Sequence, residues 1–436
     1  MNAEQTIFTT PEVTPPPPDE LVDIMLSADS KLQMETYVTS YGFKGVVGHW
    51  GRKYLKEETD AMVAQIWGQD KVTDKTGFSE LWKVPPGTTN EHAIEDELAV
   101  VSHVTQQVLR VHDLRPEQVD FVFLGSGAAI VDHPDVIRYS RTVAEQNGFG
   151  HLIPEDPYDI DAPLYDRYLA CYSGASAMRA ALLNPKLHGK IGYFINVEGL
   201  TRLMIGADRT KSNALPPQFF SNGISAYIMI PGETFKIVLD EYGNPIEEEL
   251  VVPDKHHSLA ARVPYAHLMD QDALKRGEIF QRCGNTEMIF LPEPEDGMMI
   301  NMNGGRTGTL FLAQDPRMMP QRVNRVAGRE LTAHPERITG PTKKRRHLKT
   351  NVHPAGYDVV NELNNQTSAD VVFEWGLKPD GNTSASGNTI ALIRDSKNLK
   401  PGDHVLSAVM GGGSIQGAMV LQVGETNIAS HITNTL

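Results

Sequence analysis

Apolar and polar positions along the 436-residue chain follow two periods in turn, which predict helices and strands. Between residues 98 and 111, apolar side chains recur every three or four positions, the spacing of one face of a helix. Pro116 ends this pattern, and the apolar run over 121–124 that follows is typical of a buried strand. The same criteria predict a helix over 134–147 and strands over 192–197 and 224–230.

A similar alternation returns in the C-terminal part of the chain. It predicts helices over 315–330, after His353 and over 386–396, and strands over 371–375, 404–410 and 418–423. Two successive portions that mix helices and strands in this way indicate a layered α/β fold with an internal duplication.

Two stretches interrupt the alternation. Residues 1–35 are polar and proline-rich, with Pro15 to Pro18 consecutive, which predicts a flexible arm. Residues 232–295 are charged and punctuated by prolines, which predicts an insertion with one helix near 268–281. The chain is therefore expected to divide into an arm (1–35), an N-terminal half (36–231), an insertion (232–295) and a C-terminal half (296–436).

Composition narrows the class of protein. The net charge of −15 argues against nucleic-acid binding, and no apolar run approaches the length of about 18 residues that predicts a membrane helix. The N-terminus lacks the features of a secretory signal, and two distant cysteines do not make a disulfide framework. These features predict a cytoplasmic protein. We expect no metal site, and Gly125-Ser-Gly127 lacks the rest of a dinucleotide fingerprint.

The first candidate for chemistry is Cys171, which is surrounded by small residues. Ala175, Met178 and Leu182 follow it at helical spacing, so Cys171 is expected at the start of a buried helix that ends near Pro185. The positive end of a helix favours a thiolate over a thiol, which would activate Cys171 as a nucleophile. The alternative is a small apolar core residue, as most unpaired cysteines are.

Three further motifs carry groups that can stabilise a developing oxyanion. They are His353 in His353-Pro-Ala-Gly356, Asn382 in Gly381-Asn382-Thr-Ser, and the glycine run 411–413. A histidine and a primary amide can both donate to an oxyanion, and so can backbone N–H groups in a glycine turn. Taken singly, each also has a structural explanation, as a strand end, a cap or a tight connection.

In this order, the motifs resemble 3-oxoacyl-acyl-carrier-protein synthase III and its relatives in the thiolase superfamily. The likeness covers about residues 37–424, weakly over 232–295. It implies an internally duplicated, five-layered αβαβα thiolase-like fold, a homodimer and no tightly bound cofactor. The substrates implied are acyl groups on coenzyme A or on the phosphopantetheine arm of an acyl carrier protein.

The resemblance also implies roles for individual residues. Cys171, His353 and Asn382 would form the catalytic triad, with Cys171 carrying the acyl group as a thioester. His353 and Asn382 would stabilise the enolate formed when a malonyl unit loses carbon dioxide. The backbone N–H groups of Cys171 and Gly412 would bind the tetrahedral oxyanion, and Gly356 would contact the carrier arm.

The sequence departs from the motifs of these relatives in ways that narrow the reaction expected of it. The C-terminal glycine run contains no cysteine, which disfavours reversible thiolysis, and Cys283 is expected to be inert. The histidine motif reads His-Pro-Ala-Gly where the fatty-acid enzyme has His-Gln-Ala-Asn, which favours a specialised biosynthetic condensation.

Two charged clusters have competing interpretations. The basic run 343–349, with Arg345 and Arg346, could bind coenzyme A phosphates or an acidic carrier protein, or be a solvated loop. Glu91, Glu95, Asp96 and Glu97 are expected to precede the helix at 98–111 and to favour its N-terminus only.

The leading functional hypothesis is decarboxylative condensation by a thioester-forming cysteine enzyme. One alternative within the same chemistry passes the acyl group from Cys171 to an alcohol or amine. A second, of a different class, is a non-catalytic subunit that keeps the fold to bind or stabilise a partner.

Overall fold

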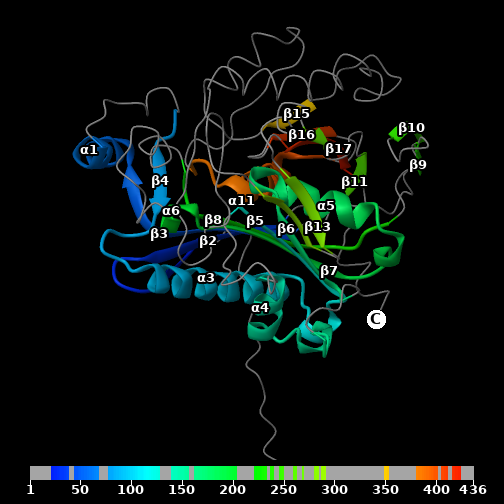
Figure 1. Cartoon of the computed structure of the whole chain (residues 1–436), viewed down its shortest axis with the longest axis horizontal. Helices are drawn as coiled ribbons and strands as arrows, with labels where there is room; N and C mark the ends of the chain where they lie inside the picture. Colours follow the sequence, from blue (N-terminus) through cyan, green and yellow to red (C-terminus); the bar gives the residue numbers. More distant parts are fainter. Residues whose placement is uncertain are drawn as a thin grey trace, which may run out of the picture.

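The computed structural model describes residues 21–38, 44–67, 77–127, 139–156, 162–203, 220–232 and 380–400, together with the strands between 236 and 423 named below. Within these residues, one ten-stranded sheet and one five-stranded sheet are stacked with helices between them (Figure 1).

The ten-stranded sheet has the order β1-β2-β3-β8-β7-β5-β6-β14-β13, and β4 pairs with β3 off this path. Its strands are β1 (Leu21–Met25), β2 (Lys31–Val38), β3 (Lys44–Leu55), β4 (Glu80–Lys83), β5 (Phe121–Ser126), β6 (Leu164–Tyr168), β7 (Gly192–Glu198), β8 (Gly223–Met229), β13 (Ile279–Cys283) and β14 (Thr286–Phe290). β5 runs parallel to β6 and β7, and β14 runs parallel to β6.

The five-stranded sheet has the order β11-β17-β16-β15, and β12 also pairs with β17. Its strands are β11 (Leu259–Arg262), β12 (Leu268–Met269), β15 (Leu348–Val352), β16 (His404–Met410) and β17 (Ile415–Val423). A separate hairpin joins β9 (Lys236–Leu239) and β10 (Pro245–Glu249).

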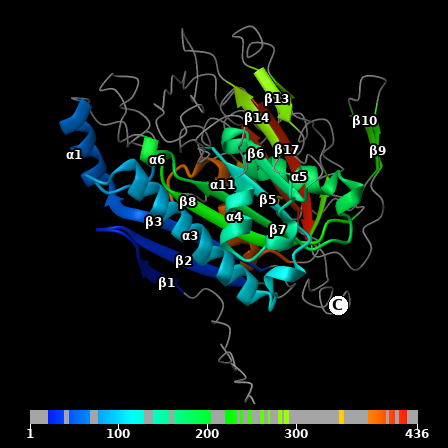
Figure 2. The same cartoon turned by 60° about the horizontal axis from the view of Figure 1, so that its bottom comes forward.

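Helices cover both faces of the ten-stranded sheet. α3 (Asn90–Val111) and α4 (Tyr139–Gln146) lie on one face, as Figure 2 shows from below. α5 (Ser173–Leu182) and α11 (Ser384–Asp395) lie on the other, below the five-stranded sheet in Figure 1. The other α-helices of the described residues are the 12-residue α1 (Lys56–Trp67) and the four-residue α6 (Leu200–Leu203). These elements make up four successive layers, helix, sheet, helix and sheet.

A hydrophobic core lies on each face of the ten-stranded sheet. Val100, Val101, Val104 and Val108 on α3 are buried against the sheet, because their spacing places them on one side of the helix. Across the other face, four aromatic rings from neighbouring strands form a continuous stack below α5. They are Tyr165, Phe123, Phe194 and Tyr227, with successive ring centroids 4.4, 5.2 and 5.2 Å apart.

Several sequence predictions require correction. Residues 21–35, assigned to a flexible arm, form β1 and most of β2, because their apolar positions pair along the edge of the large sheet. The helix expected near 268–281 is wrong, since strands occupy Leu268–Met269 and Ile279–Cys283. The helix expected at 98–111 begins at Asn90, where the Thr89 side chain accepts a hydrogen bond from the His92 N–H.

The segment 232–295 contributes strands to both sheets, since β14 pairs with β6 and β11 pairs with β17. The boundaries of the four expected regions remain predictions. The helices expected over 315–330 and after His353, and the strand over 371–375, lie outside the described residues. No helix in the part of the chain that the structure describes is both long and apolar enough to span a bilayer.

Candidate active site

Cys171 lies in a single helical turn, Ala170–Tyr172, between the end of β6 and the start of α5. Ala170 adopts the left-handed conformation, with φ of 48°, which is uncommon for a residue with a side chain. The Ser173 hydroxyl holds the turn by accepting from the Leu169 N–H at 2.9 Å and donating to the Ala170 carbonyl at 2.6 Å. The local sequence therefore fixes the position of the thiol, as strained turns often do at functional sites.

Asn382 lies in the loop before α11. Its side chain is buried, and its Oδ1 accepts from the Ser384 N–H at 2.8 Å. Its backbone carbonyl accepts from the Ser221 N–H at 3.0 Å, next to a bridge between Phe220 and Asn382. These bonds orient the amide, so that its nitrogen faces away from the helix backbone.

The two halves of the chain meet at Cys171. The Cys171 thiol donates to Ser384 Oγ across 3.4 Å, although the two residues are 213 positions apart in the sequence. The turn that carries Cys171 also packs against α11, β16 and β17. The structure therefore places Cys171 next to Ser384, two residues after Asn382 in the sequence.

The other predicted site residues, His353, Gly356, Arg345, Arg346 and Gly412, lie outside the described residues. Two of their neighbours are placed. β15 ends at Val352, immediately before His353, and β16 ends at Met410, two residues before Gly412. Because β15 and β16 are adjacent and parallel, their carboxyl ends lie at the same edge of the five-stranded sheet.

Burial of Cys171 acts against the expected activation of its thiol by the helix N-terminus. Burial raises the pKa of the Cys171 thiol to about 12, although the hydrogen bond to Ser384 opposes that rise. The nearby carboxyl of Glu198 raises it further. Desolvation disfavours the thiolate, so a nearby proton acceptor would help Cys171 to act as a nucleophile.

Sequence reasoning missed Glu198, which lies at the end of β7 and is fully buried. Its Oε2 accepts from the backbone N–H groups of Gly127 at 3.0 Å and Ala385 at 3.2 Å, and its carboxyl hydrogen-bonds with Ser384. Burial raises its pKa to about 8, against those hydrogen bonds. The sequence did contain a signal for Glu198, which ends an apolar strand and precedes a glycine. Burying a carboxylate at such a position costs free energy unless hydrogen bonds or a function compensate for it.

A hydrogen-bonded chain thus runs from the Cys171 thiol through the Ser384 hydroxyl to the Glu198 carboxyl. With a pKa of about 8, the Glu198 carboxyl is mostly protonated at neutral pH, and its ionised fraction could accept the thiol proton through Ser384.

The raised pKa of Glu198 also predicts how the stability of the protein depends on pH. Because its folded pKa of about 8 exceeds the ordinary value of 4.5, the native state binds more protons than the unfolded state between these values. The free energy of unfolding is therefore expected to fall as the pH rises from 4.5 to 8. Glu198→Gln should flatten this fall in urea unfolding, whereas Glu95→Gln, an exposed change on α3, should not. An unchanged pH dependence in Glu198→Gln would contradict this assignment.

In the acidic cluster at residues 91–97, two side chains do more than favour the N-terminus of α3. Asp96 accepts hydrogen bonds from the Ser27 N–H and hydroxyl, and Glu97 is fully buried inside the molecule. The Glu97 carboxylate pairs with Arg202 Nε at 3.3 Å and accepts from the Tyr139 hydroxyl at 3.1 Å. Only Glu91 lies in the first turn of α3. This group therefore anchors α3 to the segment that follows Glu198.

No protein-family model matches the sequence, and no curated protein matches it. Solved structures with a similar fold do match. A 3-oxoacyl-[acyl-carrier-protein] synthase III from Aquifex aeolicus VF5 shares 17% identity with a TM-score of 0.51, over 89% of this chain and 98% of that one. A synthase III from Thermus thermophilus shares 18% identity with a TM-score of 0.54, over 90% and 98%.

A third similar structure is 1,3,6,8-tetrahydroxynaphthalene synthase, a bacterial type III polyketide synthase from Streptomyces coelicolor A3(2). It shares 14% identity with a TM-score of 0.54, over 90% of this chain and 98% of that one. At such identities the likeness establishes the fold. The prediction of an α/β thiolase fold is confirmed.

Proposed function

We propose that this chain is a condensing enzyme that carries an acyl group on Cys171 and extends it with a malonyl-type unit. The observation that carries this proposal is the contact between Cys171 and Ser384, which sets a buried thiol beside the loop of Asn382. The synthase III and polyketide synthase names of similar structures support the same class of reaction.

In the first step, Cys171 Sγ attacks the carbonyl carbon of an acyl thioester. The tetrahedral oxyanion is held by the N–H groups of Cys171 and Gly412 and then collapses, releasing the donor thiol. The proton of Cys171 passes to that leaving thiolate, and Ser384 and Glu198 lie where they can relay it. The product of this half-reaction is a thioester on Cys171.

In the second step, the malonyl thioester loses carbon dioxide and becomes an enolate. His353 and Asn382 donate hydrogen bonds to its oxygen, where the negative charge develops. The enolate carbon attacks the acyl carbonyl, a carbon–carbon bond forms, and the bond to Cys171 Sγ breaks. No redox change and no metal ion enter this balance.

The acyl donor is proposed to be a coenzyme A or carrier-protein thioester. Arg345 and Arg346 would pair with its phosphates, and the chain would face the pantetheine arm at Gly356. The free thiol of Cys171 suits a reducing compartment such as the cytoplasm. Departures from the fatty-acid motif favour a role in specialised biosynthesis.

A homodimer is also part of the proposal. The edge of β6 at Asp166–Tyr168 already pairs with β14 of the same chain. This part of β6 is therefore not a free sheet edge. A second copy could pair with it only by displacing β14, and would otherwise bind at another surface.

The test is intact-protein mass spectrometry after incubation with acyl thioesters of graded chain length. The native protein is expected to gain the mass of one acyl group, and Cys171→Ser is expected to lose the hydroxylamine-labile adduct. Cys283→Ser, the matched control, should keep it. Adduct formation on Cys283, or no adduct with any donor, would overturn the proposal, and the second result would favour a non-catalytic subunit.

A further inference from the structure

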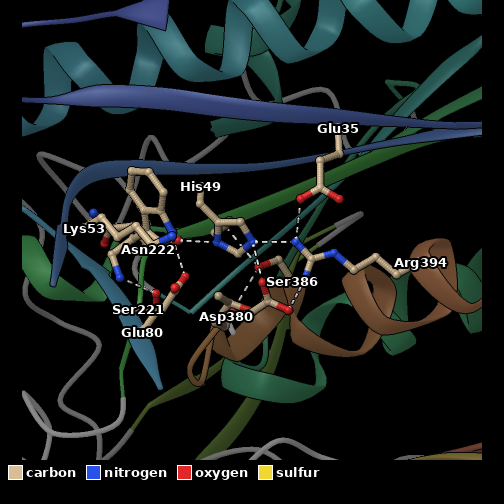
Figure 3. A network of polar contacts seen from close by, with 12 residues as sticks. Glu35, His49, Lys53, Glu80, Ser221, Asn222, Asp380, Ser386 and Arg394 are labelled. Atoms are coloured by element: carbon tan, nitrogen blue, oxygen red, sulfur yellow. Dashed lines mark hydrogen bonds and ion pairs between the residues drawn. The ribbon is translucent and has the colours of Figure 1, made fainter. Parts of the chain in front are cut away.

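Four ionisable side chains from four separate elements meet beside the loop of Asn382 (Figure 3). Asp380 precedes Asn382 by two residues, and Arg394 lies on α11. Arg394 pairs with both Asp380 and Glu35 of β2, the latter at 3.0 Å. His49 of β3 pairs with Asp380 at 3.0 Å. Arg394 is thus a cation shared by two carboxylates, those of Asp380 and Glu35.

His49 has an oxygen acceptor at each ring nitrogen. Nδ1 lies 3.1 Å from the Asn222 carbonyl, and Nε2 lies 3.0 Å from Asp380 Oδ1, while Arg394 Nη2 is further away at 3.5 Å. A carbonyl can only accept. Burial raises the pKa of Asp380, but His49 and Arg394 outweigh it and hold that pKa below its ordinary value, so this oxygen also accepts. His49 therefore joins Asn222 to Asp380 through one contact at each ring nitrogen.

The two groups that His49 contacts flank the position of Asn382. On one side is Asp380, in the same loop as Asn382. On the other is Asn222, which follows Ser221, whose N–H donates to the Asn382 carbonyl. His49 and Asp380 are almost fully buried, with side chains 6% and 2% exposed. His49 therefore ties together the two segments that hold Asn382.

A purely structural purpose explains this arrangement poorly. Buried ion pairs contribute little net stability, because desolvation of the charges offsets their attraction. Apolar residues of similar volume stabilise a core as well or better. What charged groups supply is a fixed geometry, and this cluster fixes the loop that carries a proposed catalytic amide.

We propose that the His49–Asp380 pair, braced by Arg394 and Glu35, is a positioning device that sets the Asn382 amide for the condensation step. This inference rests on the role of Asn382 in the proposed function. His49 acts through the loop and does not touch the reacting atoms. Tyr37, which donates to Glu35, completes the cluster at the end remote from Asn382.

The test is a double-mutant cycle with two readouts, carbon dioxide release from a malonyl thioester and acyl loading of Cys171. His49→Gln should lower kcat for condensation roughly 10- to 100-fold, the cost of a small misplacement, with KM for the acyl donor unchanged. Acyl loading should be unaffected. In the Asn382→Ala background, His49→Gln should cause no further loss, because the group that it positions is absent.

Lys53→Gln is the matched control. It breaks a half-exposed ion pair with Glu80 in the same region, visible in Figure 3, and should leave both readouts unchanged. If His49→Gln does not fold, Asp380→Asn tests the same contact with a side chain of the same shape.

The outcomes separate this inference from the proposed function. Normal condensation by Asn382→Ala would overturn the role of Asn382 itself. Loss of condensation in Asn382→Ala but not in His49→Gln or Asp380→Asn would overturn the positioning role alone. Losses that multiply in the double variant would do the same, since they would show that His49 acts independently of Asn382.

Discussion

Asn382→Ala is expected to lower malonyl-dependent release of carbon dioxide roughly 100- to 1000-fold, the usual cost of removing one donor to a developing oxyanion. The amide is buried and its Oδ1 accepts from the Ser384 N–H, so an alanine at this position supplies no donor in its place. Acyl loading of Cys171 should persist, because the first oxyanion is bound by backbone N–H groups.

The measurement compares both half-reactions in the same preparation, by trapping carbon dioxide and by intact mass. Asn398→Ala, an exposed change just beyond α11, is the control and should behave like the native protein. A transferase that passes the acyl group to an alcohol or amine needs no enolate. Retained transfer to such acceptors, with full activity in Asn382→Ala, would favour that alternative over condensation.

Arg202→Met is expected to destabilise the protein by about 3–5 kcal/mol, the cost of leaving a buried charge without its partner. Arg202 and Glu97 are each 1% exposed, so water cannot solvate the carboxylate that remains. Burial already raises the pKa of Glu97, and Arg202 lowers it. Without Arg202, we expect Glu97 to take up a proton at a higher pH, and part of the loss to be recovered in acid.

Urea unfolding measures this effect, with Arg141→Met as the control. Arg141 pairs with Glu145 one turn along α4, where both side chains are partly exposed, and its loss should cost under about 1 kcal/mol. The double variant Glu97→Leu/Arg202→Met should recover most of the stability, since it leaves no buried charge. A double variant as unstable as Arg202→Met alone would argue against an electrostatic cause.

Part of the proposed site could be predicted from the sequence, because its motifs are short and follow one another in a characteristic order. Cys171 and Asn382 could be found because each lies in a short motif of small residues, and the strands around them follow clear apolar runs. Glu198 and His49 could not be assigned in this way. Their significance depends on Ser384 and Asp380, nearly two hundred or more positions away, and a periodic pattern carries no such information.

Two features depend on contacts that a single segment does not show. A helix that begins near Cys171 favours an acidic thiol, but the burial that opposes this effect cannot be read from one segment. Residues 21–35 were assigned to an arm from their composition. They form strands because β3 offers them an edge, and tertiary pairing often overrides local preference in strands.

The contact between Cys171 and Ser384 also has a consequence for the order of folding. During synthesis, the N-terminal strands and α5 leave the ribosome long before α11, whose residues complete the core around the cysteine turn. Contacts of such high sequence separation form late, because a long loop must close first. Cys171, the proposed nucleophile, should therefore gain its contacts with Ser384 and its neighbouring Asn382 together, at the last stage of folding. An unfinished chain would then present a cysteine without the machinery to turn over a thioester.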